Sequence, residues 1–137
     1  MKENKKTAEI ITEVILLLLS IVLTAGVKTF ISPCEHKTDS GMWMACHWAG
    51  QAVFGAGTAL CANSLLMLIL KGRERTGLAL ANITLAVVTA FIPNTLINLC
   101  MKSEMRCHSV MKPAVIVISI LIAAVSCVYI VINKNKE

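Results

Sequence analysis

The sequence predicts an all-α fold: a four-transmembrane-helix bundle built as two helical hairpins, with both termini cytoplasmic. The first observation is composition, because 56% of the 137 residues are hydrophobic and only 15% are charged, whereas ordinary soluble domains have about 25% charged residues. A soluble domain of this size could not bury so much apolar surface in one core. The second observation is distribution, since the apolar residues gather in four long runs. About 20 apolar residues suffice to cross a bilayer, so each run predicts a membrane helix.

The chain is expected to form a single integral membrane domain over residues 1–137. The predicted helices cover residues 10–31, 49–70, 77–99 and 114–132. They are joined by outer loops at residues 32–48 and 100–113 and by an inner turn at residues 71–76.

The first and third runs need separate justification. A basic start and the small residues 24–26 are also typical of a signal peptide, but the first run exceeds the roughly 7–15 residues of a signal core and is expected to be retained. In the third run, Pro93 lacks a backbone donor and is expected to kink or loosen the far end of the helix. The sequence leaves open whether three polar residues there line an outer cavity or pack among helices: Asn94, Thr95 and Asn98.

Basic residues set the predicted orientation, because loops rich in Lys and Arg stay on the cytoplasmic side. With both termini inside, eight basic residues lie on the inner side: Lys2, Lys5, Lys6, Lys71, Arg73, Arg75, Lys134 and Lys136. Five lie on the outer side: Lys28, Lys37, Lys102, Arg106 and Lys112. The expected location is therefore the cell (cytoplasmic) membrane, crossed several times, with both termini cytoplasmic.

Small or polar residues at helical spacing predict close packing of three helices, because lipid supplies no hydrophobic drive between them. They are Ala52, Ala56, Ala59 and Asn63 in the second run, Asn82, Ala86, Thr89 and Pro93 in the third, and Ser119, Ala123 and Ser126 in the fourth. Three such stripes favour a compact bundle, although small residues are common in membrane helices generally. No charged residue lies deep in a run, since Glu13 is within a turn of the inner boundary, so an ion path through the middle is not expected.

A short phrase occurs twice, each time directly before an apolar run. It reads Met-Ala-Cys-His at residues 44–47 and Met-Arg-Cys-His at residues 105–108, and a further cysteine precedes each copy. The candidate site residues lie in or beside the outer loops: Cys34, Cys46, His47, Cys100, Cys107 and His108. The other two cysteines, Cys61 and Cys127, lie within apolar runs and are expected to be small core residues.

Three interpretations of these residues stay open. Structural disulfides lead, because thiols outside a membrane meet an oxidising compartment, and four cysteines can pair in three ways. A soft metal or haem site is the second, since Cys, His and Met donors select copper, zinc or haem iron, although neither C-x-x-C nor C-x-x-C-H is present. A thiol–disulfide oxidoreductase is the third, because the positive end of a helix favours the thiolate of Cys46 or Cys107.

The two Cys-His motifs also carry a family resemblance. The pattern Met-x-Cys-His-Trp at residues 44–48, followed by Gln51-Ala52, and Cys107-His108 with Pro113 five residues on resemble a domain-of-unknown-function family of small four-helix bacterial membrane proteins. The resemblance covers nearly the whole chain. It implies four membrane helices, outer loops with Cys-His motifs and a role beside an ABC-type exporter, and it implies no catalytic residue.

The expected function is non-enzymatic: a small accessory or binding subunit whose outward Cys/His/Met-rich cap is disulfide-stapled or binds a soft metal or haem. The alternative is a membrane thiol–disulfide oxidoreductase. The expected partners are the lipid bilayer and either a transporter subunit or further copies of this chain. Nucleic acid is not expected despite the net charge of +5, because aromatic residues make up only 4% and the basic residues sit at the ends of the apolar runs.

Overall fold

The computed structural model describes residues 2–30, 41, 45–92, 95 and 110–135, with the side chains of residues 45 and 46 outside that description. Within these residues the chain forms four helices and no strand. They are α1 (Lys2–Lys28), α2 (Ala45–Ile69), α3 (Glu74–Phe91) and α4 (Lys112–Lys134). The predicted all-α four-helix architecture is confirmed, and the orientation of the termini stays a prediction.

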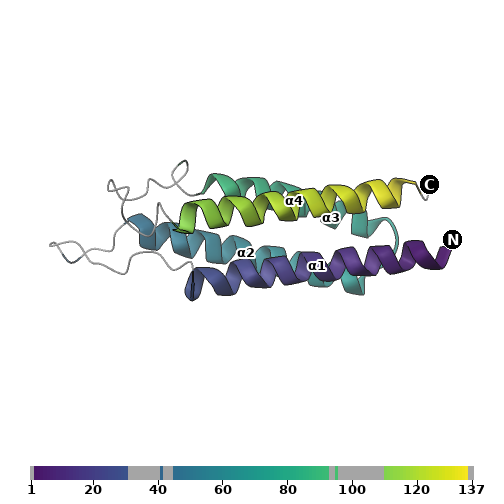
Figure 1. Ribbon diagram of the computed structural model, residues 1–137, viewed down its shortest axis with the longest axis horizontal. Helices are drawn as coiled ribbons and strands as arrows, with labels where there is room; N and C mark the ends of the chain where they lie inside the picture. The colour runs from purple at the N-terminus through teal and green to yellow at the C-terminus, as the bar shows by residue number, and fades with distance from the viewer. Residues whose placement is uncertain (1, 31–40, 42–44, 93–94, 96–109, 136–137) are drawn as a thin grey trace.

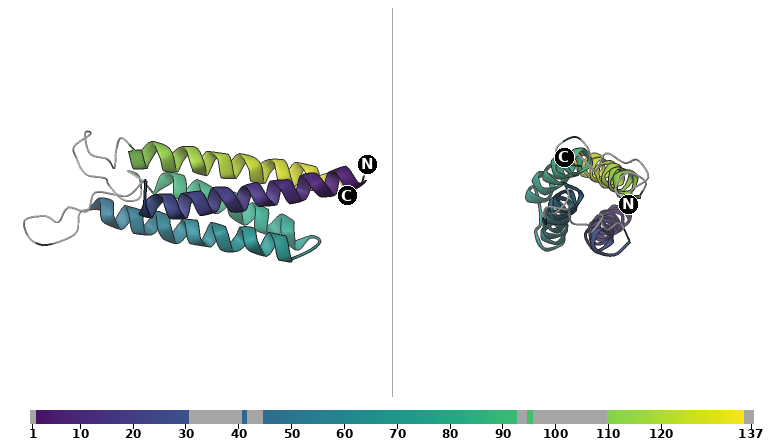
Figure 2. Two further views of the ribbon diagram at one scale, coloured as in Figure 1. Left: turned by 60° about the horizontal axis from the view of Figure 1, so that its bottom comes forward. Right: turned by 90° about the vertical axis from the view of Figure 1, so that its left-hand side faces the viewer.

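The helices lie side by side as a bundle in which each one packs against two neighbours. The neighbouring pairs are α1 with α2, α2 with α3, α3 with α4, and α4 with α1 (Figure 2). The start of α1, the turn at residues 70–73 and the end of α4 meet at one end of the bundle, which we call the charged end (Figure 1). The end of α1, the start of α2, the end of α3 and the start of α4 meet at the opposite end, which we call the loop end. The molecule is therefore two helical hairpins placed side by side.

Three helices are long and apolar enough to cross a membrane: Lys2–Lys28, His47–Ile69 and Lys112–Lys134. Their outer surfaces are apolar as well as their inner ones, as Leu18 (56% exposed), Ile120 (59%) and Val131 (61%) illustrate. Soluble monomers rarely expose continuous apolar surfaces of this kind. The bundle therefore has the surface expected of a protein that sits in lipid.

Two helix boundaries differ from the sequence prediction by eight residues, and the others differ by four residues or fewer. Helix α1 begins at Lys2, not at residue 10, because the polar segment before the apolar run is rich in Lys and Glu, which are good helix formers. Helix α3 ends at Phe91, not at residue 99, shortly before Pro93, which cannot donate a backbone hydrogen bond and would crowd the preceding turn. The predicted effect of Pro93 on the chain beyond it lies outside the described residues, as do Asn94 and Asn98, while Thr95 is an exposed turn residue.

Polar residues occupy much of the bundle interior. The predicted stripe on α3 is buried at Asn82, Ala86 and Thr89, and the stripe on α4 is buried at Ser119 and Ser126. The prediction for α2 was displaced by one position, because Ala52, Ala56, Ala59 and Asn63 are only half-buried. The buried line of α2 runs instead through Ala49, Val53, Gly57, Leu60, Ser64 and Met67.

Helices α1 and α2 approach closely at Gly57. A Cβ atom at this position would lie 2.6 Å from Thr24 Oγ1, so a larger residue fits only if the Thr24 side chain or the helices move. The Thr24 hydroxyl donates to the Ser20 carbonyl at 2.8 Å and also lies 3.6 Å from Cys61 Sγ. This contact holds α2 against α1 near the C-terminal end of α1, as small residues do in membrane bundles.

Candidate functional site

The Cys and His residues singled out in the sequence fall largely outside the described residues. Those outside are Cys34, Cys100, Cys107 and His108, and the side chain of Cys46 is outside as well. His47 is half-buried in the first turn of α2, and its ring meets the ring of exposed Trp48 edge-on, with centroids 5.8 Å apart. The predicted disulfides and metal or haem site therefore remain predictions.

The helix ends that flank the two Cys-His loops can be placed. Lys28 ends α1, His47 lies in the first turn of α2, and Lys112 begins α4, and these helix ends all lie at the loop end of the bundle (Figure 1). Among the described residues, no group of three or more His, Cys, Asp or Glu side chains could hold a metal ion.

Cys61 and Cys127, the cysteines within the helices whose side chains the structure describes, are free thiols with different surroundings. Cys61 is half-buried between α1 and α2, near Thr24, which partly fits the expectation of a small core residue. Cys127 is exposed on α4, so the expectation that it lies in the core was wrong. In helices that are apolar on every side, sequence alone does not distinguish a core position from a lipid-facing one.

The most developed polar arrangement lies at the charged end, where a buried ion pair joins α1 to α3. Glu13 is 1% exposed, Arg75 is 17% exposed, and Arg75 Nη1 lies 3.0 Å from Glu13 Oε1. Arg75 also donates from Nε to the carbonyl oxygen of Leu70, the residue after α2. One guanidinium therefore binds the end of α2 and the carboxylate of α1 from the first turn of α3.

Helix α4 joins this arrangement through Tyr129, the single tyrosine of the chain. Its side chain is 1% exposed, and its hydroxyl interacts with both the Glu13 carboxylate and the Arg75 guanidinium. A second link lies one turn further along α4, where Asn133 Nδ2 donates to Thr76 Oγ1 at 2.8 Å. All four helices are thus held together at the charged end by polar side chains.

A buried charge in an apolar bundle is stable only when it is paired and its remaining hydrogen-bonding capacity is used. Glu13 is paired with the Arg75 cation and interacts with the Tyr129 hydroxyl, although its Oε1 atom accepts no hydrogen bond from the described residues. Beside this arrangement lies a cavity of about 230 Å³, lined in part by Glu9, Arg73 and Tyr129.

Sequence reasoning did not identify this cluster. Glu13 was placed near the inner boundary, Arg75 was assigned to the basic inner turn, and Tyr129 was not considered. One observation could have indicated it, since a carboxylate inside an apolar run needs a cationic partner and the nearest basic turn, at residues 71–75, is the natural source. The choice of Arg75 over its neighbours depends on the packing of α3 against α1 and α4, which the sequence does not state.

These features define the chain as a four-helix bundle of membrane-spanning character with a buried ion pair at one end. A family comparison matches residues 16–132, which is 117 of the 137 residues, to a domain of unknown function, DUF4418. The chain belongs to this family. Comparisons with curated proteins and with solved structures give no match.

Proposed function

We propose that the protein is a multi-pass protein of the cytoplasmic membrane that acts without catalysis, as a small accessory or binding subunit with an outward cap. The observation that supports this is the common position of the helix ends around the two Cys-His loops, all at the loop end (Figure 1). The charged end then faces the cytoplasm, in agreement with its basic residues. The resemblance to small membrane proteins that work beside ABC-type exporters suggests a transporter subunit as the partner.

The cap is proposed to be held by disulfides among Cys34, Cys46, Cys100 and Cys107. Thiols outside a membrane meet an oxidising compartment, and a bridge between loops would join the two hairpins at the end opposite the charged end. Soft-metal or haem binding by the same thiols with His47 and His108 is the second form of the proposal.

Thiol counting on the purified protein, before and after reduction and together with metal analysis, tests the proposal. Stable disulfides predict two reactive thiols in the denatured, unreduced protein, Cys61 and Cys127, and six after reduction, since the chain has six cysteines. A Cys127→Ser variant is the matched control, because it should lower both counts by one without altering the cap.

Other outcomes distinguish the alternatives. If the protein binds about one equivalent of copper, zinc or iron, and both His47→Ala and His108→Ala lose it, the metal or haem form of the proposal replaces the disulfide form. Quinone-dependent reoxidation that is lost in Cys46→Ser but kept in Cys127→Ser would contradict the non-enzymatic proposal and assign a thiol oxidoreductase. Six reactive thiols in the unreduced protein, without bound metal or redox cycling, would contradict both the disulfide and the metal or haem form of the proposal.

A further inference from the structure

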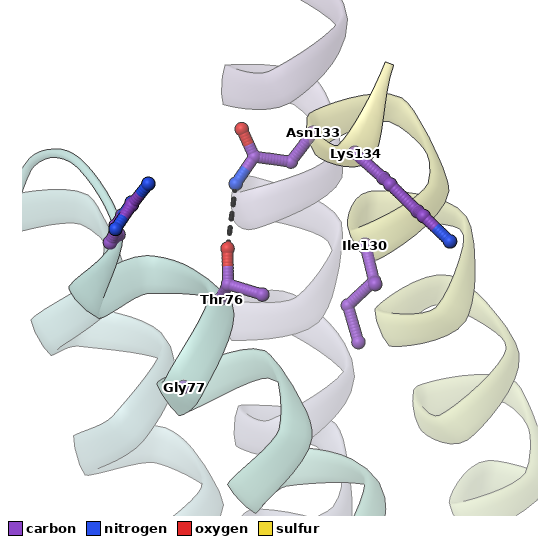
Figure 3. A pocket seen from close by; sticks show the side chains of 6 residues that line it. Thr76, Gly77, Ile130, Asn133 and Lys134 are labelled. Carbon is purple, nitrogen blue, oxygen red and sulfur yellow. Dashed lines mark hydrogen bonds between the residues drawn. The ribbon is translucent and has the colours of Figure 1, made fainter. Parts of the chain in front are cut away.

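A groove between the start of α3 and the end of α4 has no role in the proposed function. Its volume is about 430 Å³, and it is lined by Arg73, Thr76, Gly77, Ile130, Asn133 and Lys134. Figure 3 shows the Thr76–Asn133 hydrogen bond spanning the two helices, with Ile130 between them on the side toward the middle of the bundle. Three lining residues, Arg73, Thr76 and Asn133, also line the 230 Å³ cavity beside Tyr129. The groove is therefore the outer neighbour of the buried ion-pair site.

The groove carries positive charge from two helices. Arg73 and Lys134 are exposed side chains on opposite walls of the groove, one before α3 and one at the end of α4. Arg73 is the N-cap of α3 and provides no side-chain cap, so the positive end of the helix dipole adds to the potential there. Two carboxylates lie nearby: Glu74, exposed in the first turn of α3, and Glu9, which lines the adjoining cavity with Arg73. The groove lining itself contains two cationic side chains and no carboxylate.

The groove is polar at the charged end and apolar further along the helices, which matches the headgroup and the acyl chains of a lipid. Thr76 and Asn133 supply a hydroxyl and an amide beside the two cationic side chains, and Ile130 follows one turn deeper along α4. Val131, 61% exposed, and Leu80, 55% exposed, continue the apolar surface along α4 and α3. Basic pockets between the ends of membrane helices are typical sites for anionic lipid headgroups.

We propose that this groove binds one anionic phospholipid, with its phosphate between Arg73 and Lys134 and its acyl chains along the apolar surfaces of α3 and α4. The Thr76 hydroxyl and the Asn133 amide, joined by their hydrogen bond, lie between the headgroup position and the cavity that Arg75 lines. A free phosphate would use the same cationic groups but would gain nothing from Ile130 and the apolar surface beyond it.

Native mass spectrometry of the full-length protein in detergent, titrated with phosphatidylglycerol or phosphatidylcholine, tests this site. The wild type should bind its first phosphatidylglycerol more tightly than its first phosphatidylcholine. Each basic residue near a headgroup contributes about fivefold in affinity, so Arg73→Gln/Lys134→Gln should weaken the first phosphatidylglycerol by about 25-fold. The control variant Lys2→Gln/Lys5→Gln removes the same charge from exposed positions at the same end, outside the groove lining. It should change the affinity for the first phosphatidylglycerol by less than about twofold.

A third variant tests the groove without changing any charge. A Cβ atom at Gly77 would meet nothing within 4 Å, so Gly77→Leu should be accepted by α3 and should fill the groove. It should lower phosphatidylglycerol binding at least tenfold by occlusion, while circular dichroism shows unchanged helix content. Unchanged binding in Gly77→Leu, or an equal loss in Lys2→Gln/Lys5→Gln, would overturn the proposal. Displacement of phosphatidylglycerol by millimolar inorganic phosphate would overturn the choice of a lipid as the ligand.

Discussion

Removing one partner of the Glu13–Arg75 pair should destabilise the bundle far more than removing both. At the observed separation of 3.0 Å, the attraction between the charges is about 5 kcal/mol for an effective dielectric constant of about 20. The loss of hydration on burial largely offsets this attraction, so an apolar pair in the same place can be equally stable. A single substitution leaves the remaining charge buried without its partner, which costs about 3–5 kcal/mol.

The structure predicts an order among the variants. Arg75→Met leaves the carboxylate of Glu13, which is 1% exposed, while Glu13→Leu leaves the guanidinium of Arg75, which is 17% exposed and can reach water. Arg75→Met should therefore be the more damaging, near 5 kcal/mol, and Glu13→Leu nearer 3 kcal/mol, both within the about 3–5 kcal/mol range for a broken buried pair. The double variant should lie within about 2 kcal/mol of the wild type.

Reversible unfolding in mixed micelles, with an increasing fraction of sodium dodecyl sulfate and circular dichroism as the signal, measures these free energies. Glu3→Leu is the matched control, since Glu3 is exposed in the first turn of α1 and should change stability by no more than about 0.5 kcal/mol. If the two single effects simply add in the double variant, the pair has no coupling and the reasoning is refuted.

Two further variants test the packing of each hairpin by the same unfolding assay. Gly57→Ala should destabilise the protein by about 1–3 kcal/mol, because its Cβ would lie 2.6 Å from Thr24 Oγ1. Gly55→Ala is the control and should be neutral or stabilising, because nothing lies within 4 Å of a Cβ there. Equal effects of the two variants would refute the close approach. Asn133→Ala should cost about 1 kcal/mol through the lost bond to Thr76, and a wild-type value would show that this bond does not contribute.

The four helices could be predicted from the sequence because each apolar run is long enough to cross a membrane and lies between basic or loop-forming segments. The buried faces of α3 and α4 were also predicted, since Asn82, Thr89, Ser119 and Ser126 are polar residues that would be costly in lipid. The buried face of α2 was wrong by one residue, because alanine and glycine positions there differ little from their neighbours in polarity. Size alone does not tell whether a small residue meets lipid or another helix.

The ion pair at the charged end illustrates a second limit. Glu13 and Arg75 are 62 positions apart, and Tyr129 lies 54 positions beyond Arg75. Their meeting depends on the closure of the bundle between α1 and α4, for which no local pattern exists. Basic residues in the turn can either set the membrane topology or pair with a buried carboxylate. Arg75 pairs with Glu13, while its neighbours Arg73 and Glu74 remain at the surface.

We propose that both Cys-His pairs lie on one side of the membrane, opposite the charged end. Single-cysteine variants that keep only Cys46, only Cys107, or only Lys71→Cys in a cysteine-free background, treated with a membrane-impermeant maleimide in intact cells, test it directly. We predict labelling at positions 46 and 107 without permeabilisation, and at position 71 only after it. Labelling of positions 46 and 107 from opposite sides of the membrane would contradict the two-hairpin arrangement and the proposed cap.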